Sequence, residues 1–169
     1  MDVRAAIELL ENDIPPNPPD GYRLLDTGAG FNILFGPVFG RLIDGRPVLG
    51  FRVSNRHINP HKTCHGGVIA TFADFQAYVA HHDAGLINIV TPTINMTVDF
   101  LSPAVLGDWL ETRTELVRRT QTMIFSQTLA TVDGRPVFRS NSIFKIGKSA
   151  ENPGSALGNF FRNLEESTK

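Results

Sequence analysis

The stretch from residue 66 to residue 80 constrains the fold more than any other part of the chain. It reads Gly-Gly-Val-Ile-Ala-Thr-Phe-Ala-Asp-Phe-Gln-Ala-Tyr-Val-Ala. Its length corresponds to about four helical turns at 3.6 residues per turn. Apolar residues fall on nearly every side of such a helix, which predicts that it is buried all round. The rest of the chain must therefore supply a layer that encloses it.

The segments on either side of this helix read as β-strands. Residues 31–54 are predicted to form a hairpin, because Asp44-Gly45 is a favoured tight-turn pair between two apolar runs. Apolar and polar residues alternate from 93 to 100, and a second Asp-Gly pair stands at 133–134. The strands expected from these patterns cover residues 38–43, 47–53, 93–100, 109–118, 122–132 and 136–146.

Strands that tight turns connect pair in antiparallel fashion. The predicted fold class is therefore α+β, with an antiparallel sheet against one long helix over about residues 65–83. A chain of 169 residues suits one domain, and it can bury roughly 70% of its unfolded surface.

Three regions divide the chain. Residues 1–30 are expected to hold an N-terminal helix over 2–11, followed by a proline-rich linker. Residues 31–147 form the main domain, and residues 148–169 form a tail with a short helix near 156–164.

Bulk composition narrows the class of partner. Lysine and arginine total 16 against 17 acidic residues, so nothing favours a nucleic-acid partner. The single cysteine, Cys64, excludes an internal disulfide and fits a reducing compartment. The N-terminus does not read as a secretory signal, and no stretch approaches the roughly 20 apolar residues of a membrane span. We therefore expect a cytoplasmic protein with no membrane partner.

Gly66 and Gly67 stand where the long helix begins. The first N–H groups of a helix lack internal partners and lie at the positive end of its dipole, so they can bind an oxyanion. Glycine also lets a ligand approach the backbone closely. The alternative is that the two glycines only turn a loop into a helix.

Asp74 is a carboxylate on an otherwise apolar helix. Burying such a group is costly unless something pairs with it. Burial also raises a carboxylate's proton affinity, which suits a general base. The alternatives are that Asp74 shares a solvated stripe with Gln76 and His81, or that it only bonds to neighbouring backbone.

The spacing of these two positions carries a structural consequence. Gly66 and Asp74 are eight residues apart, or about 12 Å along one helix. A base and an oxyanion hole must both lie near 3 Å from the reacting groups. If both residues are catalytic, Gly66 of one subunit must face Asp74 of another, which predicts a symmetric oligomer.

Two other chemistries fit the same region less well. His57, His61 and His65 are spaced by four, as metal ligands on a helix would be, but Pro60 and the glycine pair argue against such a helix. No metal site is expected. Cys64 beside His65 suggests a thiol nucleophile, yet sequence neighbours rarely form a catalytic pair and a lone cysteine is usually packing.

The spaced motif resembles that of the hotdog-fold thioesterases, in the phenylacetate-degradation (PaaI-like) branch. That pattern is an Asn, five residues, His-Gly-Gly, and an Asp nine residues after the His. The matching positions here are Asn59, His65, Gly66, Gly67 and Asp74. The family's Ser or Thr at the start of the next strand falls on Thr93, counted back from Ser102-Pro103.

This resemblance implies a fold, an assembly and a mechanism. The sheet would wrap round the helix, two subunits would join their sheets, and dimers would often pair into tetramers. The Gly66 N–H would polarise the thioester carbonyl, and Asp74 of the partner would act as base or nucleophile. Thr93 and Asn59 would hold the attacking water or orient Asp74, and His65 would orient the loop.

The same resemblance assigns substrate contacts. Gly67, Phe75 and Tyr78 would contact the acyl group, because the rings stand where smaller residues are common. Arg118 and Arg119 would contact CoA phosphates, although such a pair near a turn is usually a solvated face. CoA is then part of the substrate, and no separate cofactor is expected.

Three other functions stay open. A hotdog dehydratase or hydratase would need a catalytic His on the helix, and none faces the expected site. A hotdog protein that only binds acyl-CoA would not need Asp74, Asn59 and Thr93 together. If the motif match is chance, an unrelated α+β binding domain is also possible.

Overall fold

The computed structural model describes residues 12–28, 30–86, 88–148 and 159–167. Within these residues one seven-stranded antiparallel sheet has the order β1-β2-β3-β5-β6-β7-β4. The elements are β1 (Arg23–Leu24), α2 (Phe31–Phe35), β2 (Phe39–Ile43), β3 (Arg46–Arg52), the 3₁₀ turn η1 (Asn55–His57), α3 (Gly66–Asp74), α4 (Ala77–Asp83), β4 (Thr93–Phe100), β5 (Trp109–Arg119), β6 (Met123–Val132), β7 (Arg135–Lys145) and α5 (Asn159–Ser167). The helix predicted over residues 2–11 lies outside the described residues.

Both predicted Asp-Gly hairpins are present. Asp44 and Gly45 join β2 to β3 with φ values of 51° and 73°, and Asp133 and Gly134 join β6 to β7 with 48° and 80°. Positive φ at both central residues defines the turn that matches the twist of paired strands. This local chemistry explains why both hairpins were readable from the sequence.

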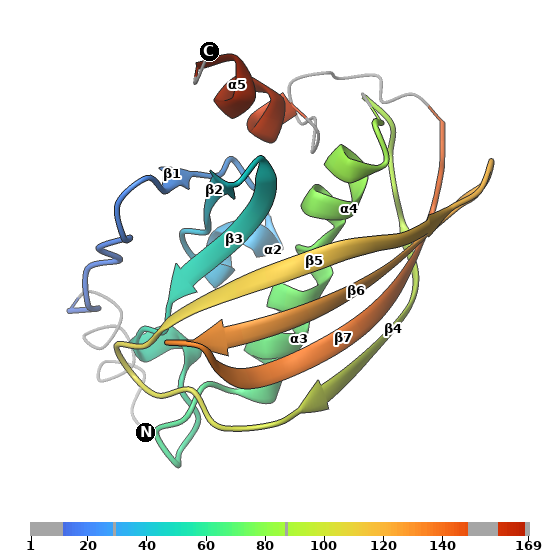
Figure 1. Cartoon of the computed structure of the whole chain (residues 1–169). Coiled ribbons are helices and arrows are strands. Elements are labelled where there is room, and N and C mark those ends of the chain that lie inside the picture. The colour runs from blue at the N-terminus through green and yellow to red at the C-terminus, as the bar shows by residue number, and fades with distance from the viewer. Residues whose placement is uncertain (1–11, 29, 87, 149–158, 168–169) are drawn as a thin grey trace.

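The sheet curves around the helical segment that the sequence predicted. Figure 1 shows α3 and α4 on the concave side of the long strands β5, β6, β7 and β4. Phe51, Phe72 and Phe138 are fully buried between helix and sheet, and the Phe51 and Phe72 rings lie 4.6 Å apart in an edge-on contact. The predicted α+β hotdog architecture is confirmed.

The long helix occupies the expected residues but is interrupted at Phe75 and Gln76. The Gln76 N–H bonds to the Ala73 carbonyl at 3.2 Å, so it does not reach the Phe72 carbonyl four residues back. The Gln76 side-chain Nε2 donates to that carbonyl instead, at 2.9 Å. Its Oε1 accepts from the hydroxyls of Thr112 and Thr114 on β5. A buried side chain therefore fixes the interruption directly after Asp74.

The N-terminal part of the predicted hairpin was wrong. Residues 31–35 form the short helix α2 rather than a strand, between Gly30 at φ 68° and Gly36 at φ 103°. Positive φ on both sides ends the helix after a single turn and a half. Phe35 anchors α2 in the core, with ring contacts of 5.0 Å to Phe51 and 5.1 Å to Phe75.

The C-terminal tail packs on the domain through α5. Phe161 is fully buried and stacks edge-on with His82, at 5.6 Å between ring centres. The rings of Phe160 and Phe161 lie where a side chain at Gly40 of β2 would be. In the part of the chain that the structure describes, no helix has both the length and the apolar character needed to cross a membrane.

Candidate active site

Asp74 and Thr93 meet at one end of the proposed site. The Thr93 hydroxyl donates to Asp74 Oδ1 at 2.6 Å, joining the last residue of α3 to the first residue of β4. Asp74 Oδ2 has no hydrogen-bond partner among the described residues. One carboxylate oxygen is therefore held in place, while the other is available to a water or a substrate.

Asp74 is exposed in the single chain, which corrects the expectation that the helix is buried on every side. The exposed stripe does not include the residues first considered for it, because Gln76 and His81 are both fully buried. Gly67, Thr71 and Asp74 share one face at the spacing i, i+4, i+7. The Asp74 carboxylate therefore lies on the α3 face formed by Gly67, Thr71 and Asp74, and not on one shared with Gln76 and His81.

The N-terminus of α3 presents a free donor. His65 is the N-cap residue, and its Nδ1 accepts the Gly67 N–H at 2.9 Å. The Gly66 N–H has no acceptor among the described residues. The predicted oxyanion donor is therefore Gly66 alone, since His65 already occupies the neighbouring N–H.

Asn59 shapes the loop that precedes the helix. Its Oδ1 accepts the N–H groups of His61 and Thr63, and its Nδ2 donates to the Thr63 hydroxyl at 2.9 Å. These bonds close the turn that leads to His65. They leave Asn59 Nδ2 with one further hydrogen, so its predicted role toward water or thioester stays a prediction.

His57 and Cys64, which two alternative chemistries would use, are both buried. His57 is buried, and its ring bonds to the Phe35 carbonyl at 2.6 Å and to the Ser54 N–H at 3.0 Å. Burial raises the pKa of Cys64 to about 12, so its thiol is not a ready nucleophile. Among the described residues, no three His, Cys, Asp or Glu side chains gather as metal ligands would.

The four predicted substrate contacts other than Gly67 are two core rings and two surface arginines in the single chain. Phe75 and Tyr78 are buried, with ring centres 6.3 Å apart, and belong to the main core. Arg118 and Arg119 are both exposed, and Arg119 also donates to the Ala84 carbonyl at the end of α4. Their roles toward the acyl group and CoA stay predictions.

Phe100 lies beside the candidate site, and the sequence argument did not include it. It is 58% exposed at the end of β4, and a Cβ built on Gly66 would lie 3.5 Å from its ring. Thr93 at the other end of β4 holds Asp74. One edge strand therefore touches both ends of α3, which the spacing of the motif did not reveal.

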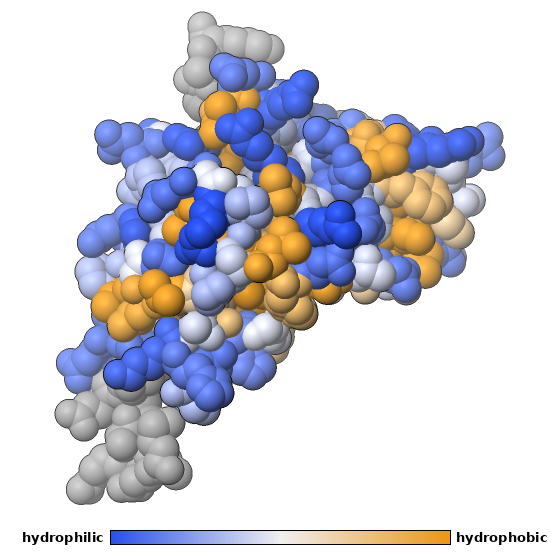
Figure 2. Space-filling view, turned by 60° about the horizontal axis from the view of Figure 1, so that its bottom comes forward, coloured by the Kyte–Doolittle hydropathy of each residue, from blue (hydrophilic) through white to orange (hydrophobic). Residues whose placement is uncertain are grey.

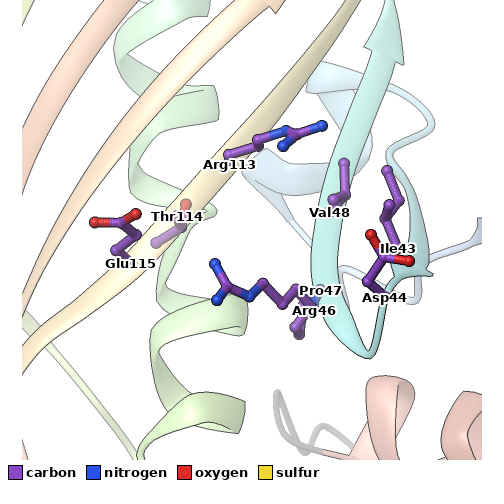
Figure 3. Close-up of a pocket in the computed structure, with 8 residues that line it drawn as sticks. All are labelled: Ile43, Asp44, Arg46, Pro47, Val48, Arg113, Thr114 and Glu115. Carbon is purple, nitrogen blue, oxygen red and sulfur yellow. The ribbon is translucent and has the colours of Figure 1, made fainter.

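Two surface hollows differ in whether they adjoin the candidate catalytic residues. The first, between the β2–β3 turn and β5, is lined by charged side chains including Arg46, Arg113 and Glu115 (Figure 3), and no candidate catalytic residue lines it. The second lies between α2 and α3 and is lined in part by His65 and Gly67, on either side of Gly66. Only the second adjoins the candidate oxyanion donor.

Comparison with known proteins finds a family match over the central part of the chain. Residues 61–138 match the model of the Thioesterase superfamily. Over these residues the chain is similar to that superfamily. A Pseudomonas aeruginosa protein, PA0474, whose name describes it as an esterase, is 29% identical over 131 residues, covering 77% of this chain and 98% of the relative.

Solved structures share the fold of this chain. A Streptococcus pneumoniae thioesterase protein with coenzyme A aligns at 21% identity over 68% of this chain and 88% of that one, with a TM-score of 0.59. The Escherichia coli PaaI protein of the phenylacetic acid degradation operon aligns at 20% identity over 63% and 75%, with a TM-score of 0.56. The family match and the esterase relative support a thioester hydrolase.

Proposed function

We propose that this thioester hydrolase acts on acyl-CoA as a two-fold dimer, with Gly66 of one subunit and Asp74 of the other at each site. The observation that carries the proposal is the contact of β4 with both ends of α3, through Thr93 on Asp74 and Phe100 beside Gly66. The acyl-CoA specificity and the residue roles rest on this geometry together with the motif.

The edge position of β4 supports the assembly. β4 is the last strand of the sheet, and Ile94 and Phe100 are 52% and 58% exposed. An unpaired edge strand is a template for another strand. Antiparallel pairing of β4 with its copy about a two-fold axis sets the Thr93 end of one strand at the Phe100 end of the other. Asp74 of each subunit then approaches Gly66 of its partner.

The proposed chemistry uses the two groups that have no partner among the described residues, the Gly66 N–H at the start of α3 and Asp74 Oδ2 at its end. The Gly66 N–H and the positive end of the α3 dipole stabilise negative charge on the thioester oxygen as a nucleophile adds to the carbonyl. Asp74 Oδ2 takes the proton of an attacking water, or adds to the carbonyl itself. Thr93 holds Oδ1, so the carboxylate turns its free oxygen toward the substrate. When water attacks, the C–S bond breaks, the proton on Asp74 passes to the CoA sulfur, and CoA leaves as the thiol beside the free acid. When Asp74 attacks, the C–S bond breaks to leave a mixed anhydride on Asp74, the CoA thiolate takes a proton from solvent, and water hydrolyses the anhydride to the free acid.

The first test replaces the carboxylate without changing its shape. Asp74→Asn keeps an acceptor for the Thr93 hydroxyl but removes the base, so kcat on acyl-CoA should fall by roughly 100-fold or more. Asp133→Asn is the matched control, because Asp133 lies in the β6–β7 turn at φ 48°, where Asn is tolerated. Thiol release is followed across a panel of acyl-CoAs. Equal turnover in the two variants would refute the role of Asp74.

A second test asks whether each site needs two subunits. Gly66→Pro removes the N–H at the first helical position, where proline is tolerated, and His65 before it already has an extended ψ of 137°. Neither Gly66→Pro nor Asp74→Asn should turn over alone. After subunit exchange, a mixed dimer has one intact site, so the equimolar mixture should regain about a quarter of wild-type activity. No recovery, despite exchange shown by mass spectrometry, would place the site within one chain.

A further inference from the structure

The short helix α2 exposes large apolar side chains beside the candidate site. Phe31 and Leu34 are 65% and 73% exposed, whereas Phe35 of the same helix is buried. On the face shown in Figure 2, apolar side chains gather in separate patches among hydrophilic ones. Clustered apolar side chains on a protein surface mark a place where a ligand or a partner binds.

These side chains form one wall of a hollow of about 410 Å³. The opposite wall is α3, and the lining residues are Phe31, Leu34, Phe35, Arg56, His57, Ile58, His65, Gly67, Val68 and Thr71. The wall is fixed rather than loose, because Phe35 contacts three core rings and its carbonyl accepts from His57 Nε2 at 2.6 Å. A fixed apolar wall binds a ligand without an ordering cost.

The hollow adjoins the proposed reaction centre. His65 and Gly67 line it and flank Gly66, whose N–H would hold the thioester oxygen. The Phe100 ring lies 3.5 Å from where a Cβ on Gly66 would be, and Phe100 does not line the hollow. An acyl group attached to a carbonyl at Gly66 therefore has open, apolar space in the direction of α2.

The charges around the hollow define the acyl group that fits. The one charged residue in its lining is Arg56, whose Nε donates to Asp13 Oδ2 at 2.9 Å. His57 is held neutral, because its Nδ1 accepts from the Ser54 N–H and its Nε2 bonds to a carbonyl oxygen. No carboxylate lines the hollow. With its one cation already paired, the hollow favours an uncharged group over a carboxylated one.

We propose that the hollow between α2 and α3 is the acyl subsite of the enzyme, and that Phe31 and Leu34 select an uncharged, apolar acyl group. This assignment rests on the proposed function, since it takes the thioester carbonyl to lie at Gly66. It gives α2, which lies before the matched family region, a role in specificity.

The test compares a long and a short substrate in the same variants. Under this proposal the acyl chain of octanoyl-CoA extends to the α2 wall and that of acetyl-CoA does not. The ratio of their kcat/KM values therefore measures the contribution of the α2 wall to substrate preference. The double variant Phe31→Ser with Leu34→Ser should lower this ratio by roughly tenfold or more. Ile33→Ser is the matched control, because Ile33 is 62% exposed on the same helix but lines a different hollow. An unchanged ratio in the double variant, or an equal fall in the control, would overturn the subsite.

A binding measurement separates this inference from the proposed function. S-octyl-CoA is a thioether that cannot be hydrolysed, and calorimetry compares its affinity with that of CoA. Tighter binding of the thioether in wild type, lost in the double variant, supports the subsite even if no thioester is turned over. Equal affinities of the wild-type protein for S-octyl-CoA and CoA would overturn the acyl subsite even if hydrolysis is observed. The double variant could instead change its oligomeric state while keeping its preference for octanoyl-CoA over acetyl-CoA. That result would assign Phe31 and Leu34 to contacts with a second copy of the chain and would also overturn the acyl subsite.

Discussion

Gln76 should stabilise the fold through its side-chain amide, and the structure allows the cost of its loss to be worked out. Gln76→Met keeps an unbranched side chain of similar length in a fully buried position. Thr112 retains the Leu49 carbonyl at 3.2 Å as an acceptor, and Thr114 retains the Thr128 hydroxyl at 2.9 Å. The two hydroxyls therefore keep partners after the substitution.

The group that loses its hydrogen bond in Gln76→Met is the Phe72 carbonyl. This group accepts from Gln76 Nε2, because the backbone N–H of Gln76 bonds to Ala73 instead. A buried carbonyl left without a donor costs about 1–3 kcal/mol. We expect the free energy of unfolding to drop by about 2 kcal/mol, and Tm to drop by roughly 4–8 °C for a chain of this size.

Urea unfolding followed by circular dichroism at fixed protomer concentration measures this change. Gln127→Met is the control, since Gln127 is exposed on β6 and donates only to Glu115 at the surface. That variant should stay within about 0.5 kcal/mol of wild type. A Gln76→Met protein as stable as the control would mean that the helix interruption does not depend on the amide.

Three further outcomes follow from single contacts. Thr93→Val should lower kcat by roughly tenfold because it removes the donor to Asp74 Oδ1, whereas Thr93→Ser should retain most activity in the same thiol-release assay. Burial lowers the pKa of His57 below its unfolded value near 6.5, so the unfolded state binds the proton more tightly and stability declines as pH falls below about 6.5. In urea titrations from pH 7.5 to 5, His57→Gln should flatten that decline, while His61→Gln at an exposed position should not. With burial raising its pKa to about 12, Cys64 should react with a disulfide reagent only after unfolding, and rapid labelling of the native protein would contradict this.

The parts of the fold that the sequence predicted are those set by neighbouring residues. Each Asp-Gly pair contains its own turn geometry, and the alternation from 93 to 100 marks β4 directly. The order of the strands was not readable, because β4 pairs with β7, whose paired residues lie 38 (Phe100 to Phe138) to 51 (Thr93 to Phe144) positions later in the chain. Local alternation shows that a segment is a strand and gives no information about which strand lies beside it.

Tertiary contacts decided the features that the sequence prediction missed. Residues 31–35 are too few for helical periodicity to be distinguished from an apolar strand, and Phe35 settles the choice by entering the core. The interruption at Gln76 depends on Thr112 and Thr114, which are 36 and 38 residues away. Phe100 beside Gly66 depends likewise on where β4 lies.

The rigidity of α3 links the chemistry of the proposed site to its assembly. Gly66 and Asp74 are separated by about 12 Å of continuous helix, and Ile69 and Phe72 between them are buried against the sheet. No loop movement can bring the two together, because the spacer is a helix with its inner face in the core. In the proposed dimer, a second copy related by a two-fold axis would supply the missing end of each site. The strand that contacts both ends of α3 is β4, whose outer edge has no partner strand among the described residues. Exposure of Asp74 in one chain is therefore the arrangement that a shared site requires.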